Sequence, residues 1–278
     1  MPLGDLGRGI RDALTSTIRG VGDVVGATLD TTRESTVKAL QGVRDIGSEA
    51  TGIITDTITG AVQAASEVGS SVGSAAKGAV IGVVQGVGEV TIVTVGTLSD
   101  TVRAAIKGTQ EVGGDVAGAG QGAVEGALVA AKSVGLTLED SVTSVARAAI
   151  EGTNEVGGDL AATAKSVIRG TIQGTQEVGE DSIAAIRSSA SAIINSAASV
   201  GGDVAIVARN AVEGAIEGAK DLGLAAEDAE AAAATGAVEA ASQVSETAGN
   251  AARNAVTGVI AGVRVVVQAP FGGEEKKQ

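Results

Sequence analysis

An aliphatic residue followed by glycine returns along this chain at a fixed spacing. Valine, or in places isoleucine or leucine, precedes glycine at positions 47, 69, 113, 135, 157, 179, 201 and 223, and each interval is 22 residues or a multiple of 22. Extended in both directions, this frame divides residues 4–267 into twelve units without an insertion or a deletion. Because a constant period of this length is typical of repeat architectures, we predict that residues 4–267 form one repeat region.

Each unit divides into two halves of eleven residues, and two positions of the first half are aliphatic in every copy. These are the fourth and the tenth positions, which carry only Val, Ile or Leu. We predict that they form an apolar stripe that packs against another helix or lies on a surface. The stripe comprises Ile18, Val24, Leu40, Ile46, Val62, Val68, Val84, Val90, Ile106, Val112, Leu128, Val134, Ile150, Val156, Ile172, Val178, Ile194, Val200, Ile216, Leu222, Val238, Val244, Ile260 and Val266.

The eleven-residue half indicates a helix. Eleven residues make three turns at about 3.67 residues per turn, close to the 3.6 of an α-helix. On a helical wheel the aliphatic positions gather on one side, and most charged residues, such as Glu111 and Lys132, fall on the other. A strand has a side-chain period of two, so successive elevens would face opposite sides of a sheet. We therefore predict an all-α protein of long amphipathic helices built from twelve Gly/Ala/Val-rich repeats, with no substantial sheet.

The pattern leaves open whether the helix is continuous. A Gly-Gly-Asp triplet at residues 113–115, 157–159 and 201–203 resembles a helix stop followed by an N-cap, so the chain is either hinged or folded back there. A double-length pattern also overlies the repeat, because RAAIKGTQEVGGD from Arg103 returns as RAAIEGTNEVGGD from Arg147. Against a turn, the aliphatic positions keep one phase through each triplet. We favour long helices with hinges at the triplets.

Glycine accounts for 42 of the 278 residues. Each glycine inside a helix costs roughly 0.5–1 kcal/mol relative to alanine, so we expect the helix to need a surface to pack against. Glycines four residues apart favour the close approach of helix backbones, whereas duplication of a low-complexity unit would explain them without a role. We predict close approach at Gly108, Gly152, Gly170, Gly174, Gly214, Gly218, Gly258 and Gly262.

Composition excludes several kinds of chemistry. The chain has no Cys, His, Trp or Tyr, and its net charge is −13. Zinc fingers, iron–sulfur clusters, disulfides and Cys- or His-based catalysis are therefore excluded, and the acidic charge argues against nucleic acid as a partner. The remaining polar residues recur at repeat positions, so none is marked out by its surroundings. We expect a protein that is not an enzyme, with no catalytic, cofactor-binding or metal-binding residues.

The two ends lie outside the repeat. Residues 1–3 form a short lead, and residues 268–278 form a tail that begins with the helix-breaking Pro270 and includes the single phenylalanine, Phe271. The first twelve residues include Asp5 and Asp12 and have no apolar core, so we expect no secretory peptide. The longest segment without a formal charge, residues 188–202, is too rich in serine to cross a membrane. We expect a cytoplasmic protein, which is either free or associated with a surface.

Segments such as SVIRGTIQGTQEVGED (166–181) and AAKGAVIGVVQGVGEV (75–90) resemble the Gly/Ala/Val/Thr-rich elevens of perilipins and synucleins. Exchangeable apolipoproteins also use 22-residue units. The resemblance is one of period and composition and covers nearly the whole chain. It implies weakly amphipathic helices that lie on lipid surfaces. This chain differs in being acidic, whereas helices that bind anionic lipid usually display Lys and Arg.

Two hypotheses of function follow from the stripe. In the first, the protein is structural and its stripes pack on those of other copies through close Gly/Ala-flanked contacts, which gives a homo-oligomer or polymer in the form of a filament, sheet, tube or bundle. In the second, the stripe coats a neutral lipid or storage-polymer surface. A third use is a rod that sets a length inside another assembly. We expect self-association to be the main partner interaction.

Overall fold

The computed structural model describes residues 4–20, 23–42 and 46–265. The predicted lead (1–3) and tail (268–278), with Phe271, lie outside the described residues. The described residues are all-helical apart from one small hairpin, which confirms the all-α prediction. The elements are α1 (Asp5–Gly20), α2 (Val24–Gly42), α3 (Ile46–Glu67), α4 (Val72–Val90), α5 (Val95–Glu111), α6 (Val116–Ser133), α7 (Leu138–Glu155), α8 (Leu160–Glu177), α9 (Ser182–Ser199), α10 (Val204–Asp221), α11 (Ala226–Val244), α12 (Glu246–Val256), β1 (Gly258–Ile260) and β2 (Val263–Val265).

The Gly-Gly-Asp triplets are turns between helices. After α5, Gly113 takes a left-handed conformation with φ of 66°, and the N–H of Gly114 donates to the carbonyl of Thr109 at 2.9 Å. The carboxylate of Asp115 then accepts the N–H of Gly118 at 3.0 Å and caps α6. This is a glycine C-cap followed at once by an Asp N-cap. The same positive φ occurs at Gly69, Gly135, Gly157, Gly179, Gly201 and Gly223.

The preference for long continuous helices is therefore wrong, and the folded-back alternative is correct. The aliphatic phase continues through each turn because the turn itself contains a stripe residue. Val112, Val156 and Val200 are the C-cap residues of α5, α7 and α9, and all three are half-buried. Their side chains pack inward although the helix has ended, so the sequence pattern does not mark the break.

The helices stack in two layers. From α1 to α11, each helix packs chiefly against the helix two places along the chain, and it also contacts its immediate neighbours. Helices α2, α4, α6, α8, α10 and α12 form one layer, here called the even layer, and α1, α3, α5, α7, α9 and α11 form the odd layer. The structural repeat is therefore a pair of helices, which explains the double-length sequence pattern at Arg103 and Arg147.

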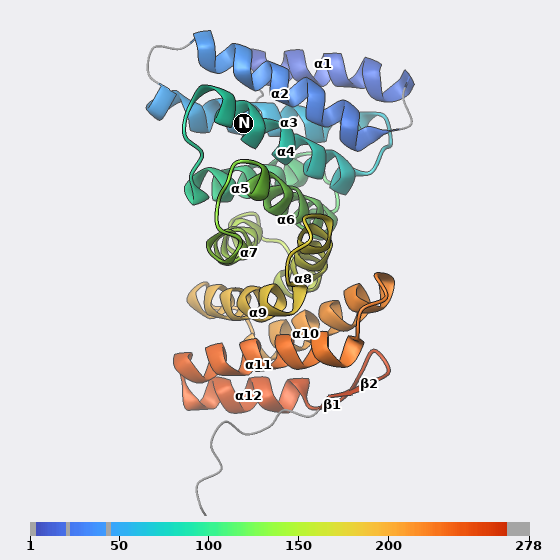
Figure 1. The fold of residues 1–278 in the computed structure, drawn as a ribbon, viewed down its shortest axis with the longest axis vertical. Helices are drawn as coiled ribbons and strands as arrows, with labels where there is room; N and C mark the ends of the chain where they lie inside the picture. Colours follow the sequence, from blue (N-terminus) through green and yellow to red (C-terminus); the bar gives the residue numbers. More distant parts are fainter. Residues whose placement is uncertain (1–3, 21–22, 43–45, 266–278) are drawn as a thin grey trace, which may run out of the picture.

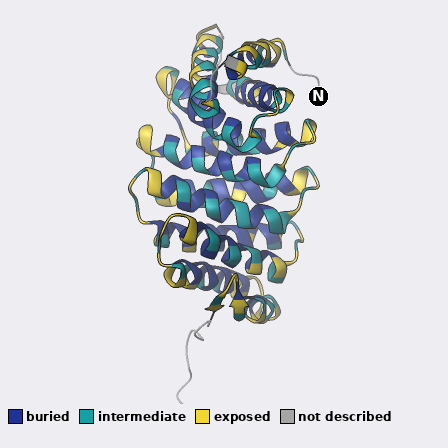
Figure 2. Cartoon of the chain, turned by 90° about the vertical axis from the view of Figure 1, so that its right-hand side faces the viewer, coloured by how far each residue is buried: buried dark blue, intermediate teal, exposed yellow. Residues whose placement is uncertain are grey.

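The pairs are stacked along the long axis of the molecule, with α1 and α2 at one end and α11, α12 and the hairpin at the other (Figure 1). The stack twists, because α7 is seen end-on in the view that shows α11 and α12 from the side. Exposed residues gather at the turns along both sides of the stack, while the buried residues run through its interior (Figure 2). The core is thus one continuous layer of Val, Ile and Ala between the two helix layers.

The last unit departs from the helical pattern. Helix α12 ends at Val256, and the β-branched segment that follows forms an antiparallel hairpin with Ile260 paired to Val263. Runs of Val and Ile favour strands, and a two-residue connection with positive φ at both positions matches a type I′ hairpin. Ile260 and Val265 are buried against the end of the stack, while Val259 on the other face is exposed.

We expect Ala261→Asn to stabilise the hairpin. Ala261 has a φ of 47°, a conformation that alanine rarely adopts, and Asn-Gly is the preferred pair for this turn. Relief of the strain should add about 1 kcal/mol to the local opening free energy. Amide hydrogen exchange at Ile260 and Val263 measures this opening free energy. Ala231→Asn, at an exposed position of helix α11, is the control. Unchanged or faster exchange in the Ala261 variant would contradict the prediction.

Candidate functional site

The apolar stripe is enclosed within the single chain. All twelve residues at the fourth position are buried, and the most exposed of them, Ile18, retains only 6% of its surface. Apart from Ile260, which lies in β1, they lie between the even and odd layers, where helices from both layers contribute to one core. The helices thus find within the same chain the surface that their glycine content led us to expect.

The tenth-position residues lie at the helix ends and are less covered. Eight of them are half-buried, and Leu222 and Val244 are exposed. The half-buried residues are Val24, Val68, Val90, Val112, Val134, Val156, Val178 and Val200. The side chain of Ile46 and the whole of Val266 lie outside the described residues. The stripe therefore leaves only scattered apolar groups on the surface.

In the even layer, helix backbones meet directly at glycine. A Cβ added to Gly170 would lie 2.4 Å from the carbonyl oxygen of Gln121 in α6, and one added to Gly214 would lie 2.4 Å from the carbonyl oxygen of Lys165 in α8. At Gly174 the nearest atom, the carbonyl oxygen of Glu125, would lie at 3.1 Å. No side chain fits at the first two positions without a shift of the neighbouring backbone. The close approach is between helices of one chain.

Contacts in the middle of the odd layer are looser. A Cβ on Gly108 would lie 3.1 Å from the Cα of Thr59, and the nearest atom to a Cβ on Gly152 would be the Cγ of Arg103 at 3.4 Å. The two layers also differ in residue type at one position of the repeat. The even helices carry glycine at Gly82, Gly126, Gly170 and Gly214, whereas the corresponding residues of three odd helices are Ala104, Ala148 and Ala192. At the two ends of the odd layer the contacts are as close as in the even layer, because a Cβ on Gly60 of α3 would lie 2.4 Å from the carbonyl oxygen of Gly7 and one on Gly236 of α11 would lie 2.3 Å from that of Arg187. The even layer is therefore the more tightly packed only beside α5, α7 and α9.

Two of the glycines assigned to close approach lie elsewhere. Gly258 begins β1 with a φ of 121°, and Gly262 is in the hairpin turn with a φ of 83°. No atom lies within 4 Å of a Cβ built on Gly258, and only the Nζ of Lys220 reaches 4.0 Å from one built on Gly262. Gly218 instead contacts a side chain, with Ile172 Cδ1 at 2.8 Å from the added Cβ.

Ion pairs run along both layers, and most of them join residues 48 or 52 positions apart. Lys77 of α4 pairs with Glu125 of α6 at 2.9 Å, and Lys165 of α8 pairs with Glu213 of α10 at 3.0 Å; both pairs are 48 residues apart. The same separation joins Lys132 to Glu180. In the odd layer Arg103 pairs with Glu151, Lys107 with Glu155 and Arg187 with Glu239. We call these contacts the ion-pair ladder.

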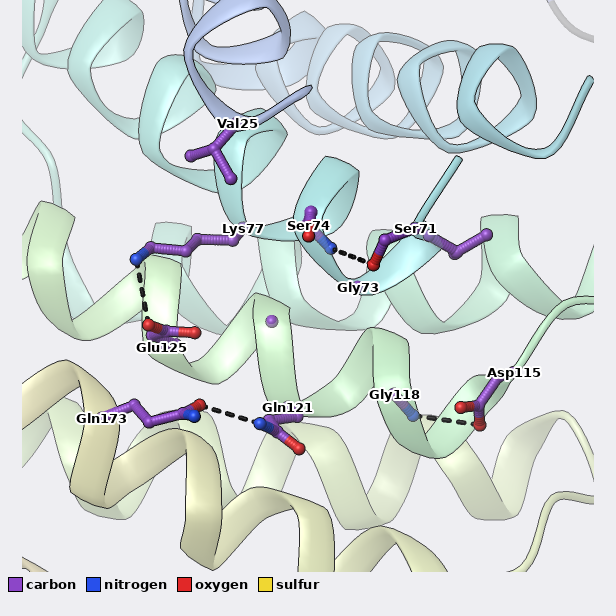
Figure 3. Close-up of a pocket in the computed structure, with 12 residues that line it drawn as sticks. Val25, Ser71, Gly73, Ser74, Lys77, Asp115, Gly118, Gln121, Glu125 and Gln173 are labelled. Carbon is purple, nitrogen blue, oxygen red and sulfur yellow. Dashed lines mark hydrogen bonds and ion pairs between the residues drawn. The ribbon is translucent and has the colours of Figure 1, made fainter. Parts of the chain in front are cut away.

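The ladder is most enclosed at Lys77. Besides Glu125, its Nζ reaches Glu177 of α8 at 2.6 Å, across the intervening helix α6. The side chains of α4 and α8 can meet here because glycines bring α6 into backbone contact with both helices. Figure 3 shows Lys77 and Glu125 together on one side of a cavity of about 600 Å³.

The same cavity holds a pair of amides and two helix N-termini. Gln121 of α6 donates to Gln173 of α8 at 2.8 Å (Figure 3). Ser71 caps α4 by accepting the N–H of Ser74, and Asp115 caps α6. Each polar group in this list already has a partner in the chain. The cavity is a polar depression of the even layer rather than a site with unpaired reactive groups.

Burial and pairing oppose each other in the Lys77 network. Burial by itself would lower the pKa of Lys77, but the hydrogen bonds from Lys77 to Glu177 and Glu125 raise it above its ordinary value. Burial raises the pKa of Glu125, although Lys77 acts in the opposite direction. Lys77 therefore remains charged and is the group that allows Glu125 to be ionised in this enclosed position.

We expect Lys77→Met to destabilise the protein at pH 7 by about 1–3 kcal/mol, because it leaves the carboxylate of Glu125 enclosed without its cation. Removal of Lys77 raises the pKa of Glu125 further. The cost is therefore present above the folded-state pKa of Glu125 and disappears as the pH falls below its unfolded-state value, where the group is neutral in both states. Urea denaturation at pH 7 and pH 4 measures the difference.

Lys107→Met is the matched control. Lys107 and Glu155 form a pair at the same spacing in the odd layer, but about half of each side chain is exposed, and the hydrogen bond to Lys107 lowers the pKa of Glu155. Loss of such a pair costs about 0–1 kcal/mol. Two results would show that enclosure of Glu125 does not cause the destabilisation. One is an equal fall in the free energy of unfolding of the two variants at pH 7, and the other is a fall in Lys77→Met that persists at pH 4.

Two further observations bear on chemistry and location. Within residues 4–20, 23–42 and 46–265, no three acidic side chains lie close enough together to hold a metal ion. In the same part of the chain, every helix is too short or too polar to span a bilayer.

No family model and no curated protein matches this chain. The likeness to perilipin, synuclein and apolipoprotein repeats stays a resemblance of period and composition.

The ion-pair ladder is a feature of the structure that was not predicted from the sequence. The signal in the sequence was the double-length pattern. One pair of units is 44 residues long, and a cation such as Arg103 is followed 48 residues later by an acid, here Glu151, which is four residues more than one pair of units. Four residues is about one helical turn, so the acid lies one turn further along the next helix of the layer. A search for charges at that separation would have indicated folded-back helices.

Proposed function

We propose that the chain is a non-enzymatic structural protein, a rod of fixed length that serves as a spacer within an assembly of further copies or other components. The observation that carries this proposal is the enclosure of the stripe, together with backbone contacts that repeat from α2 to α10 at nearly constant register. Repeats held in this way form a stiff stack whose length depends on the number of units.

Self-assembly through the stripe is no longer the mechanism we propose, because the fourth-position residues are covered inside the chain. A coat on lipid or on a storage polymer would use the same residues, so the two layers would first have to separate. Such opening would break the glycine contacts and the ion-pair ladder together. A rod needs no such change, and its ends and polar faces remain available for contacts.

Distance measurements between spin labels test the rod directly. The chain contains no cysteine, so Ser16→Cys on α1 and Thr247→Cys on α12, both exposed, can be labelled without other changes. We expect one narrow distance distribution. Removal of two helix pairs should shorten the distance by roughly 16–20 Å, since packed helices lie about 8–10 Å apart. A broad distribution, or a distance that does not follow the number of units, would overturn the proposal.

A further inference from the structure

The ion-pair ladder has a direction. In every ion pair between different helices of the described chain, the cation belongs to the earlier helix and the acid lies further along the chain. Arg33 of α2 with Glu89 of α4 and Arg169 of α8 with Asp221 of α10 are examples. A ladder with one direction ends in acids that lack an earlier helix and in cations that lack an acid on a later element.

The first two helices show the acidic end. The three ion pairs within a single helix in the described chain are all on α1 and α2: Arg8 with Asp5, Arg11 with Asp12 and Lys38 with Glu34. The carboxylates of Asp5, Asp12 and Glu34 are 98%, 69% and 69% exposed. Such exposed local pairs are worth little, so these acids can exchange partners at small cost.

The last elements show the basic end. Six cations of the described chain form no ion pair there, and four of them belong to α10, α12 and the hairpin. These four, here called the terminal cations, are Arg209, Lys220, Arg253 and Arg264. Lys220 donates to the carbonyl of Ala261 at 2.7 Å, and the buried Nε of Arg253 has no partner. Arg209 and Arg264 are exposed.

The N-terminal end also limits how closely anything can approach it. Asp30, Glu34 and Lys38 occupy the positions of α2 that correspond to Ser74, Gly78 and Gly82 of α4. Gly78 and Gly82 of α4 contact α2, which precedes α4 in the even layer. A Cβ on either glycine would lie 2.4 Å or less from an atom of α2. The charged side chains of α2 prevent that contact, so a partner meets this end through side chains.

Building on the proposed rod, we propose that its partner at each end is a second copy, joined head to tail. The terminal cations of one copy pair with Asp5, Asp12, Asp30 and Glu34 of the next and so continue the ladder between molecules. Because backbone contact is blocked at α2, this joint consists of ion pairs between side chains. It is therefore weaker than the contacts between repeats and sensitive to salt.

Sedimentation velocity at low and high salt tests the joint, with four forms of the full chain. We expect the wild type to associate at low ionic strength and to dissociate as salt is raised by about tenfold. Arg209→Glu with Arg264→Glu reverses the basic end, and Asp30→Lys with Glu34→Lys reverses the acidic end. Each reversed form should stay monomeric alone, and an equimolar mixture of the two should associate again. Arg147→Glu, an exposed unpaired cation on α7, is the control and should associate like wild type.

Restored association in the mixture supports the head-to-tail joint, because only opposite ends then carry opposite charges. A wild type that stays monomeric at low salt overturns it, as does association that neither reversal weakens. Circular dichroism of each variant separates loss of the joint from loss of fold. A monomer with a narrow spin-label distance would reject the joint and leave the rod in place, so the two proposals fail independently.

Discussion

Gly122→Ala should destabilise the protein even though alanine favours a helix. A Cβ at this position in α6 would lie 1.9 Å from the carbonyl oxygen of Gly73 in α4, and the backbone of α4 can yield only if the two helices move apart. The gain in helix propensity is about 1 kcal/mol, and the cost of forced separation in a packed layer exceeds it. We expect a net loss of about 1–3 kcal/mol in the free energy of unfolding.

Gly120→Ala is the control, because it changes the same residue type in the same helix. Its Cβ would meet only the Cγ2 of Thr163, at 3.7 Å, which is ordinary van der Waals contact. This variant should gain roughly 0.5–1 kcal/mol from helix propensity. Urea denaturation of both variants gives the two free energies. Stabilisation by both substitutions would mean that α4 and α6 are not in backbone contact and that the even layer is looser than described.

The comparison of these glycines shows what the sequence alone can predict. Spacing by four residues picked out Gly170 and Gly214, where the structure brings backbones together. Gly122 and Gly126 have the same spacing and were not assigned to close approach, although Gly122 makes the closest contact with a neighbouring backbone. The same spacing picked out Gly258 and Gly262, which lie in a hairpin. Sequence spacing describes one helix, whereas close approach depends on the helix opposite.

The stripe is a similar case. The eleven-residue period identified the buried side of every helix, down to residues such as Ile106 and Ile150 that are fully enclosed. A period states which side is apolar but not what covers it, so the sequence favoured another copy and left a lipid surface or the same chain as alternatives. The turn at Gly113 decides among them, because it returns the chain onto itself. Its own sequence signal was present but was outweighed by the unbroken aliphatic phase.

The alternation between layers makes a prediction about deletions. Removal of residues 116–203, which contain α6 to α9, joins Asp115 to Val204 after an intact Gly-Gly-Asp turn. Helix α10 then takes the place of α6 beside α4, with Glu213 where Glu125 was and therefore opposite Lys77. The odd layer keeps its ladder as well, since α11 moves beside α5. We expect this chain to fold and to unfold in one cooperative transition.

Removal of residues 116–181, which contain α6 to α8, uses the same starting point but takes out an odd number of helices. Helix α9 then enters the even layer, and Ala192 replaces Gly126, where a Cβ would lie 2.6 Å from the carbonyl oxygen of Lys77. The helices after it also change layers, and Lys77 loses its partner because Ser191 takes the place of Glu125. Each forced contact costs about 1–3 kcal/mol. We therefore expect the midpoint of thermal unfolding to lie roughly 5 °C or more below that of the chain from which residues 116–203 are removed.

The longer of the two deleted chains should thus be the less stable, which is the reverse of what chain length and buried area predict for a stack of equivalent units. Thermal melts followed by circular dichroism at 222 nm measure both midpoints, with the full-length chain as reference. If all units were interchangeable at the 22-residue level, the chain that keeps α9 would melt at the higher temperature. That outcome would show that the difference between Gly126 and Ala192 at this position does not matter, and that the repeat unit is a single helix rather than a pair.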